Sequence, residues 1–341
     1  MTTVPLARND GMTTWILVDK HSQPDQRQIF CSCETFRKRA LTADSDGVHE
    51  SIVHGIASVF CAPQYRGRGF AKFMMRQLAQ ELYTWQSNGQ SVVGTILYSD
   101  IGKKYYAQLG WQPNTTNSHV EFKPQRIAPS TLVKTIHAED IAALCERDEI
   151  LLRKTLAEPA QETRVAIIPD VDHVGWHLGK ESYTCKYLFG KEPQDKGAIA
   201  GSPGSQVWAI WTRRYYERPD VDSPHNVLYI LRLVMEQDET ATRIPADAEK
   251  NPMAGMYEEQ MSYLKAVLQT AQAEAAEWKL DAVELWDPTP LVQRMLAQMD
   301  IEYKMVERNE ESIASLLWYN DQGGKSAVLP LWVNNEHYAW C

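Results

Sequence analysis

Several features are scarce or missing in this sequence, and each absence narrows the class of protein. The 341 residues include six cysteines, and no apolar run approaches the roughly 20 residues of a membrane-spanning helix. The first residues, MTTVPLARNDGMTTW, lack the basic, apolar and small-residue segments of a secretory signal. These absences predict a cytoplasmic protein with buried, reduced thiols and no membrane partner.

An excess of positive charge is also missing, because the formal net charge is −9. A nucleic-acid-binding protein normally carries a broad basic face, so we expect no nucleic acid as a partner. With 44% hydrophobic and 23% charged residues, the chain has the composition of a globular protein, and its length favours two domains. The pair Cys31 and Cys33 is a poor zinc signature by itself, and no metal is expected.

Two common phosphate-binding motifs are absent. No stretch fits the P-loop pattern G-x-x-x-x-G-K-[ST]. The dinucleotide pattern G-x-G-x-x-G would need a glycine at Lys72, where a bulky side chain prevents close packing. The chain does contain Arg66-Gly67-Arg68-Gly69-Phe70-Ala71, which fits the pattern R/Q-x-x-G-x-G/A, and the segment from Gln64 to Gly69 fits it again.

This motif falls between a predicted strand, which ends near Cys61, and a predicted helix. Apolar residues of that helix recur in steps of three and four, at Ala71, Met74, Met75, Leu78, Leu82 and Trp85. The first N–H groups of a helix have no partner within it and favour an anion, and glycine lets a phosphate approach the backbone. The stretch therefore predicts a phosphate cradle at a helix N-terminus.

The order of the predicted elements indicates two related domains in tandem. The first half is predicted to contain a helix, an apolar strand, a short helix and a strand, at 71–85, 91–98, 99–110 and 119–123. The same order recurs at 257–279, 282–287, 290–299 and 301–306. Further strands are predicted at 14–20, 27–42, 49–62, 131–137, 207–217, 226–237 and 312–319, a helix at 138–157, and a linker at 124–131. We expect domains at 1–125 and 126–341.

Residues 50–125 resemble the GNAT acetyltransferase superfamily. In that superfamily the R/Q-x-x-G-x-G/A signature follows the central strand and binds pyrophosphate, and a second strand, here SVVGTILY, follows the helix. The segment KYYAQLGW is similar to the superfamily's short helix, with Tyr106 four residues before Gly110. The whole chain resembles the fungal lysine N6-acetyltransferase family in TTWILVDK, CSCETFRKRAL, VFCAPQYRGRGFAKFMM and LPLWVNNEHYAWC.

This resemblance implies an α/β (α+β) fold with a GNAT-type mixed, twisted sheet flanked by helices, followed by a second, degenerate GNAT-like domain. It implies an enzyme whose co-substrate is acetyl-CoA, and a small-molecule amine would attack the acetyl group directly. The expected acceptor is the ε-amino group of free L-lysine. A non-catalytic acyl-CoA-binding or scaffold protein stays an alternative, as does an acetyltransferase for polyamines or protein lysines. The oligomeric state stays open.

In the superfamily, acetyl-CoA lies between two central strands that splay apart. The resemblance implies that the backbone of the first strand holds the pantetheine arm and polarises the thioester carbonyl. The amides of 66–71 would bind the pyrophosphate, with Arg66, Arg68 and Lys72 adding charge near the phosphates. The implied cofactor-binding residues are Val59, Phe60, Cys61, Arg66, Gly67, Arg68, Gly69, Phe70 and Ala71.

The same resemblance implies that Tyr106 protonates the leaving thiolate, with Tyr105 as the fallback. A convincing Ser-His-Asp or Cys-His set is absent, which fits a direct attack by the amine. We expect no protein nucleophile to be needed.

A charged amine must lose a proton before it attacks, and the candidate bases are Glu50 and His54 on the central strand and Glu34 on the strand beside it. His54 shares a strand face with residues 56, 58 and 60, so we expect it on the side of the thioester carbonyl. In tandem GNAT proteins resembling the enhanced-intracellular-survival family, the terminal carboxylate acts as the base. That resemblance makes the carboxylate of Cys341 a competing candidate.

The second half contains no copy of the phosphate motif, since DETATRIPADAEKNPMAGM after the strand at 226–237 lacks the R/Q-x-x-G-x-G/A spacing. We expect this half to bind no CoA and to shape the acceptor pocket. Acidic and aromatic candidates for gripping a cationic amino acid are Trp332, Glu336, Tyr338 and Trp340. GNAT domains also begin with a strand and helices, and few residues precede WILVDK. Either the first domain is shortened or the second half fills that position.

Overall fold

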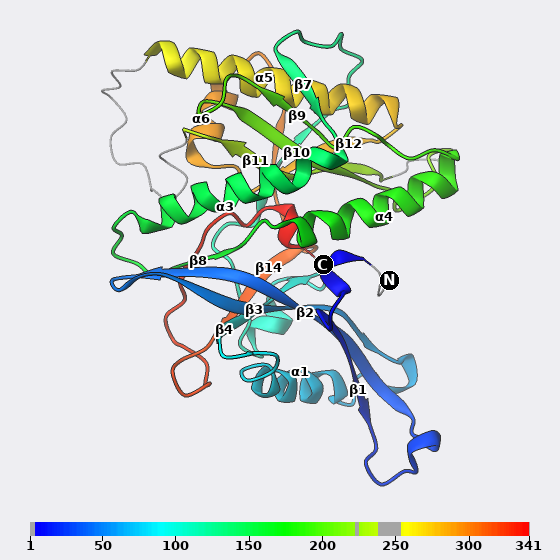
Figure 1. The fold of residues 1–341 in the computed structure, drawn as a ribbon. Coiled ribbons are helices and arrows are strands. Elements are labelled where there is room, and N and C mark those ends of the chain that lie inside the picture. The colour runs from blue at the N-terminus through cyan, green and yellow to red at the C-terminus, as the bar shows by residue number, and fades with distance from the viewer. Residues whose placement is uncertain (1–3, 222–224, 238–253, 341) are drawn as a thin grey trace.

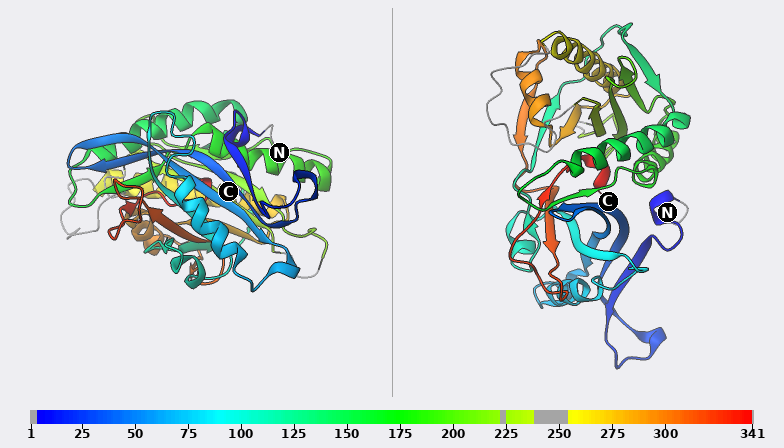
Figure 2. Two further views of the ribbon diagram at one scale, coloured as in Figure 1. Left: turned by 90° about the horizontal axis from the view of Figure 1, so that it is seen from below. Right: turned by 60° about the vertical axis from the view of Figure 1, so that its left-hand side comes forward.

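Two mixed β-sheets with a layer of helices between them make up the protein in this computed structural model (Figure 1). The structure describes residues 4–221, 225–237 and 254–340. Helices α3 (Ile141–Ala157) and α4 (Val171–Phe189) form the middle layer, and α1 (Phe70–Glu81) and α5 (Ala254–Glu277) cover the outer faces (Figures 1 and 2). None of the helices in these ranges is long and apolar enough to cross a membrane.

The first sheet is built around the long antiparallel strands β2 and β3. Its order is β15-β8-β2-β3-β4-β14-β5, and β1 pairs with another part of β2. Its strands are β1 (Met12–Val18), β2 (Ile29–Asp44), β3 (Gly47–Cys61), β4 (Ser91–Ser99), β5 (Gln112–Pro113), β8 (Arg164–Ile167), β14 (Ile313–Trp318) and β15 (Leu331–Trp332). The predicted strand ending at Cys61 is confirmed, and the predicted helix after it ends at Glu81 rather than Trp85.

The second sheet has the order β13-β6-β12-β11-β10-β9-β7. Its strands are β6 (Ser118–Phe122), β7 (Val133–Ile136), β9 (Gly197–Ala200), β10 (Val207–Arg214), β11 (Val227–Met235), β12 (Ala282–Trp286) and β13 (Lys304–Glu307). The remaining α-helices are α2 (Lys104–Ala107) and α6 (Pro290–Gln298). Buried apolar side chains of α5 and this sheet form the largest core cluster.

The repeat expected from the sequence is present in the topology. In the first sheet, β3 is followed by α1 and by β4, which pairs with β3 in parallel. In the second sheet, β11 is followed by α5 and by β12, which pairs with β11 in parallel. Each sheet therefore contains the same strand–helix–strand unit, which confirms a second GNAT-like half.

The two halves of the chain exchange strands. Strand β6 comes early in the chain but pairs with β12 in the second sheet. Strand β14 comes late but pairs with β4 in the first sheet, and β8 pairs with β2. The sheets consequently do not divide the chain at residue 125, and the domain boundaries at 1–125 and 126–341 stay a prediction. Strand β8 of the second half pairs with residues 40–43 of β2, and whether the second half replaces the missing N-terminal elements stays a prediction.

Helix α4 was not predicted, because polar residues interrupt the apolar ones on its buried face. His173, His177 and Glu181 are buried on it together with Val174, Trp176 and Cys185. A Cβ at Gly175 would lie 2.9 Å from Pro5, and one at Gly179 would lie 3.2 Å from Val4. These glycines let the N-terminal segment pack against the helix, and no apolar stripe marks the helix in the sequence.

Candidate functional site

An opening between β3 and β4 is the first element of the candidate site. The parallel pairing of the two strands ends at Ile56 and Leu97, while β3 continues along β2 to Cys61. The register between β2 and β3 shifts just beyond this point, and Ser58 has a φ of 53°. Such a bulge bends the strand, so the side of 57–61 that faces β4 has no strand partner among the described residues.

Backbone amides at two predicted cofactor residues face this opening. On the β2 side, the amide of Ala62 donates to the carbonyl oxygen of Phe30 at 3.3 Å. Because successive amides of a strand point to alternate sides, those of Cys61 and Val59 point toward β4. The side chain of Phe60 between them is about half exposed. The opening therefore offers backbone donors to the carbonyl oxygen of a ligand.

The loop between β3 and α1 is the second element. Gly67 and Gly69 have left-handed φ angles of 73° and 84°, and Gly69 is the N-cap of α1. A Cβ built at either glycine would meet nothing within 4 Å. The first turn of this 12-residue helix thus has open space beside its unpaired N–H groups, as an anion site requires.

The two arginines of the motif lie over aromatic rings at the edge of this loop. The guanidinium of Arg68 is 5.2 Å from the ring centre of Phe70, and that of Arg66 is 5.9 Å from the ring centre of Phe60. Arg66 Nε also donates to the carbonyl oxygen of Cys61 at 3.0 Å. Both arginines are exposed, so the positive charge at the helix N-terminus is accessible to a solute, while Phe70 and Ala71 are half-buried.

Tyr105 and Tyr106 lie beside the open half of β3, in the apolar cluster that also contains Cys33 and Ile56. Burial raises the pKa of Tyr106, and the adjacent Tyr105 raises it further. Burial also raises the pKa of Tyr105. Both phenols are therefore protonated at neutral pH, and the raised pKa makes each of them a weaker acid than an exposed tyrosine.

The position of His54 differs from the expectation. Its side chain is fully buried on the α1 side of the sheet, and Nε2 lies 3.0 Å from the carbonyl oxygen of Trp85. Burial lowers the pKa of His54 to about 4, although this hydrogen bond opposes the shift. His54 shares a face with Ile56, but Ser58, expected on the same face, instead donates to Glu34 at the bulge. The face of His54 packs under α1, and His54 has no exposed atom that could take a proton from a substrate.

Glu50 lies far from the opening. It pairs with Arg153 of α3 and lies near Arg39. It comes six residues before Ile56, the last residue of β3 that pairs with β4, which is about 20 Å along a strand. The structure does not bring Glu50 together with the other predicted site residues.

Glu34 lies at the opening itself. Its Oε2 accepts a hydrogen bond from Ser58 Oγ at 2.9 Å, directly at the bulge. Phe36 and Lys38 follow at alternate positions of the strand, and they contact Trp176 of α4 and the carbonyl oxygen of Ala339. Glu34 therefore belongs to the face of the first sheet that looks toward the second sheet. Cys341, the remaining predicted base, lies outside the described residues.

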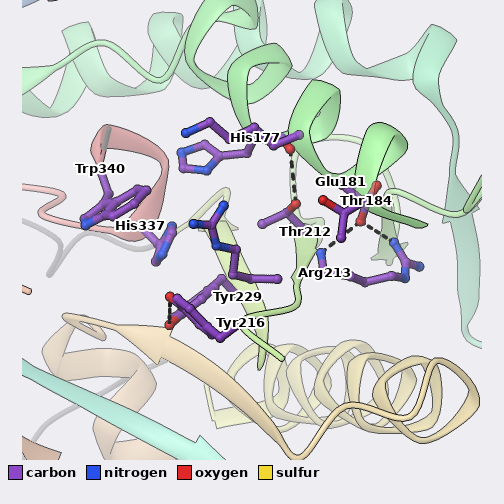
Figure 3. Close-up of a pocket in the computed structure, with 11 residues that line it drawn as sticks. His177, Glu181, Thr184, Thr212, Arg213, Tyr216, Tyr229, His337 and Trp340 are labelled. Carbon is purple, nitrogen blue, oxygen red and sulfur yellow. Dashed lines mark hydrogen bonds and ion pairs between the residues drawn. The ribbon is translucent and has the colours of Figure 1, made fainter. Parts of the chain in front are cut away.

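A pocket lined by residues of the second half is the third element (Figure 3). It lies between α4, the ends of β10 and β11, and the C-terminal segment. Its lining consists of His177, Lys180, Glu181, Thr184, Thr212, Arg213, Arg214, Tyr216, Tyr229, His337 and Trp340. The hydroxyls of Tyr216 and Tyr229 are 3.0 Å apart on one side, and Glu181 pairs with Arg213 at 2.7 Å on another (Figure 3).

The pocket is cationic, which corrects the expectation of acidic groups that hold a cation. Three cationic side chains, Lys180, Arg213 and Arg214, line it together with one carboxylate, Glu181. That carboxylate is already paired with Arg213 and with Lys196. The Nε of Arg214 is buried and has no hydrogen-bond partner in the described part of the chain. The arrangement favours a ligand with a negative group.

The two histidines of the pocket add no charge at neutral pH. Burial and the nearby Lys180 lower the pKa of His177 to about 3. Burial, His177 and two arginines lower the pKa of His337 well below its usual value. Both imidazoles are therefore neutral.

Of the four residues expected to grip an amino acid, Trp340 lines the pocket. Trp332 and Tyr338 are buried in the core between the sheets. The carboxylate of Glu336 is also buried, where it is held by Arg232 and by the amide of Leu233. The side chains of Trp332, Glu336 and Tyr338 therefore make contacts inside the protein, because the C-terminal segment runs through its interior.

Aromatic contacts connect the pocket to β3. Ala57, at the start of the open half, packs against the cluster of Phe36 and Trp176. The Nζ of Lys180 is 4.1 Å from the ring centre of Trp176 and 5.6 Å from that of Trp340.

Similar contacts connect the pocket to β4. Tyr98 follows Leu97, the last residue of β4 that pairs with β3, and its ring centre is 6.1 Å from that of Trp286. The ring of Trp286 is in turn 4.5 Å from that of His337. One layer of aromatic side chains thus joins the pocket to both strands at their opening.

Sequence reasoning missed His177, Lys180 and Arg214. The first two are three residues apart, which has meaning only on a helix, and α4 carries no apolar stripe that marks it as one. Arg214 is visible in the sequence as part of an arginine pair, but its neighbours across the pocket come from distant segments.

Comparisons with known proteins agree with this architecture. A lysine acetyltransferase of Yarrowia lipolytica is 24% identical over 264 residues, which cover 64% of this chain and 64% of that protein. The uncharacterized protein YGR111W of Saccharomyces cerevisiae is 21% identical over 359 aligned positions, covering 97% of this chain and 82% of that protein. Saccharomyces cerevisiae N-myristoyltransferase with bound myristoyl-CoA has a similar fold, with a TM-score of 0.50, 7% identity and coverage of 87% and 65%.

The parallel strand pair with its intervening helix, present once in each sheet, defines a tandem protein of the GNAT type. Residues 119–341 match the family described as the LYC1 GNAT-like C-terminal domain, and the chain belongs to that family. This membership confirms the resemblance drawn from the sequence motifs. The chain spans 64% of the length of the Yarrowia lipolytica relative.

Substitution of Gly69 tests whether the loop holds a phosphate-bearing ligand. We expect Gly69→Glu to weaken binding of CoA at least 100-fold, because it puts a carboxylate and bulk at the helix N-terminus. Gly69→Ala is the matched control: its methyl group meets open space, and the left-handed φ costs about 1–2 kcal/mol. Calorimetric titration with CoA measures both variants, and an affinity of Gly69→Glu equal to that of Gly69→Ala contradicts the assignment.

Proposed function

We propose that the protein is a cytoplasmic N-acetyltransferase that moves the acetyl group of acetyl-CoA to a small amine. The observation that carries this proposal is the opening of β3 and β4 beyond Ile56 beside the uncovered N-terminus of α1. A linear ligand with a pyrophosphate at one end and a thioester at the other fits this combination of a helix N-terminus and unpaired strand amides. The membership of the LYC1 family supports the same reading.

In this proposal the pantetheine arm lies along residues 57–61 of β3. The amides of Val59 and Cys61 donate to the arm and to the thioester carbonyl, with Phe60 flanking it. The pyrophosphate is bound by amides of 66–71, and Arg66 and Arg68 move from their aromatic rings onto it. The second half takes no CoA, so each chain binds one molecule; residues 238–253, which make up most of the stretch without the motif, lie outside the described residues.

The acetyl group is transferred in one step. The neutral amine nitrogen attacks the thioester carbon, a carbon–nitrogen bond forms, and the carbon–sulfur bond breaks to release CoA thiolate. Tyr106, which is protonated at neutral pH, gives its proton to the thiolate. The nitrogen loses its extra proton to water as the amide forms, and the Tyr106 phenolate takes a proton back from water. The amide product leaves with the acetyl group, and CoA leaves as the thiol.

Before the attack, the ammonium form of the amine must lose a proton. Glu34 is the base that we propose, because its carboxylate lies at the bulge on the face toward the pocket. His54 is buried on the other face and Glu50 lies far along the strand, so we propose neither of them as the base. A terminal carboxylate at Cys341 stays a prediction.

The two proton carriers can be separated from binding by substitution. We expect Tyr106→Phe and Glu34→Gln each to lower kcat by about 10²–10⁴-fold, the usual contribution of a general acid or base. The affinity for CoA should stay within twofold, because neither change touches the helix N-terminus. Steady-state kinetics and calorimetry measure these quantities. If a variant keeps the full kcat, the residue that it replaces does not have the role proposed here.

The charge of the pocket indicates which kind of amine could be the acceptor. Arg214 and Lys180 would bind a carboxylate, and one aromatic layer separates them from the opening where the thioester would lie. A free amino acid such as L-lysine has a carboxylate at one end and an amine at the other. A polyamine has no carboxylate, and the cations of the pocket would repel it. The charge of the pocket therefore favours free lysine among the amines considered.

This preference can be tested with lysine and cadaverine, which is lysine without its carboxyl group. We expect Arg214→Gln to raise the KM for lysine about tenfold or more, since a charged hydrogen bond contributes about 1.5–3 kcal/mol. The KM for cadaverine should stay the same or fall. Arg218→Gln, an exposed arginine paired with Asp220, is the control and should change neither. An equal change for both amines would contradict a carboxylate contact.

The activity itself is tested by release of CoA from acetyl-CoA with lysine, polyamines or a histone peptide as the acceptor. We expect lysine to give the highest kcat/KM. Reaction with a peptide or polyamine but not with lysine would replace the acceptor and keep the enzyme class. Tight binding of CoA without turnover of any amine would instead favour the non-catalytic acyl-CoA-binding alternative.

A further inference from the structure

The second sheet contains an opening like the one in the first sheet. The parallel pairing of β11 and β12 ends at Ile230 and Leu285, and β11 continues to Met235. The register between β10 and β11 shifts next to Ile230, as the register between β2 and β3 shifts just beyond Ile56. Counted from the last pair, Leu233 has the position on β11 that Val59 has on β3.

This second opening is occupied by the C-terminal segment of the same chain. The amide of Leu233 donates to Glu336 Oε2 at 2.8 Å. The other carboxylate oxygen pairs with Arg232, which also binds Asp148 of α3 at 2.7 and 2.8 Å. The exposed fractions of Arg232, Glu336 and Asp148 are 7%, 4% and 1%, so all three side chains are buried. A carboxylate of the chain thus sits on the amide that a ligand would otherwise use.

The same segment leads from this contact to the acceptor pocket. After Glu336 comes a short 3-10 turn, His337–Ala339, and then Trp340. Lys38 Nζ donates to the carbonyl oxygen of Ala339 at 3.1 Å, and the Tyr338 hydroxyl donates to the carbonyl oxygen of Ile167 at 2.6 Å. The turn is therefore fixed to β11 of the second sheet at one end and to β2 and β8 of the first sheet beyond it. It lies in the layer between the sheets (Figure 1).

We propose that Glu336 is a positioning residue, an internal ligand that fills the second opening and thereby holds His337 and Trp340 in the acceptor pocket. The filling of the second opening rests on the contacts of Glu336 alone. Only its consequence for the acceptor amine rests on the proposed function.

Hydrogen exchange of the full-length protein tests the filling without any need for activity. We expect Glu336→Ala to speed exchange at least tenfold in peptides of 226–237 and 331–340, because it removes the acceptor of the Leu233 amide. Exchange over 47–81, which carries β3 and α1, should not change. Glu336→Gln keeps an oxygen acceptor and should restore most of the protection, and it also serves if the alanine variant does not fold. Glu302→Ala, at an exposed pair with Lys123, is the control.

Kinetics test the positioning role. We expect the KM for the amine to rise about tenfold in Glu336→Ala and less in Glu336→Gln, with the affinity for CoA unchanged. Unchanged exchange in 226–237 overturns the filling of the opening. Altered exchange with an unchanged amine KM, or with equal losses for amine and CoA, overturns the positioning role. If the unaltered protein acetylates no amine, the proposed function fails, and the exchange data still decide whether Glu336 fills the opening.

Discussion

Two parallel strands that stop pairing part-way along their length are the feature on which the rest of this structure depends. The pairing of β3 with β4 ends after Ile56, next to the bulge at Ser58, and the amides beyond it that point toward β4 lose their strand partners. Buried backbone donors need an acceptor from a ligand, from water or from another segment. The first sheet leaves its donors beside the open N-terminus of α1. The second sheet satisfies one of them with the carboxylate of Glu336.

The exchange of strands between the two halves of the chain links the two openings. β14 borders β4, and β6 borders β12, so each opening is completed by the other half of the chain. The layer between the sheets then receives α3, α4 and the C-terminal segment, whose side chains pack against both. The cationic pocket is assembled at that layer: Arg214 comes from β10, Lys180 from α4 and Trp340 from the C-terminal segment. All of its lining residues belong to the second half of the chain, but they come from segments that are far apart in the sequence.

Features that depend on short-range spacing could be predicted from the sequence. The glycines of the motif and the apolar stripe from Met74 to Leu82 indicated a strand, a tight turn and a helix, and these are the elements β3, Gly67–Gly69 and α1. Features that depend on which side a sheet is covered could not. His54 was expected on the same face as Ser58 and Phe60, but the bulge at Ser58 and the packing of α1, which the sequence does not show, leave His54 buried. Helix α4 was not predicted because its buried residues include two histidines and a glutamate among the apolar ones, and these polar residues find their partners far away in the chain.

The sequence by itself determined the glycine turn before α1 and the repeated strand–helix–strand order, because both follow from local backbone preferences and side-chain periodicity. Tertiary structure alone decided which strands border each opening, which of the candidate bases lies beside the bulge, and the sign of charge in the pocket. The acidic and aromatic tail illustrates the difference. Its composition suggested a site for a cationic ligand, yet the carboxylate of Glu336 is paired with Arg232 and accepts a hydrogen bond from a backbone amide. A charge acts on a ligand only where folding leaves it without a closer partner, and that is set by contacts between residues about a hundred positions apart.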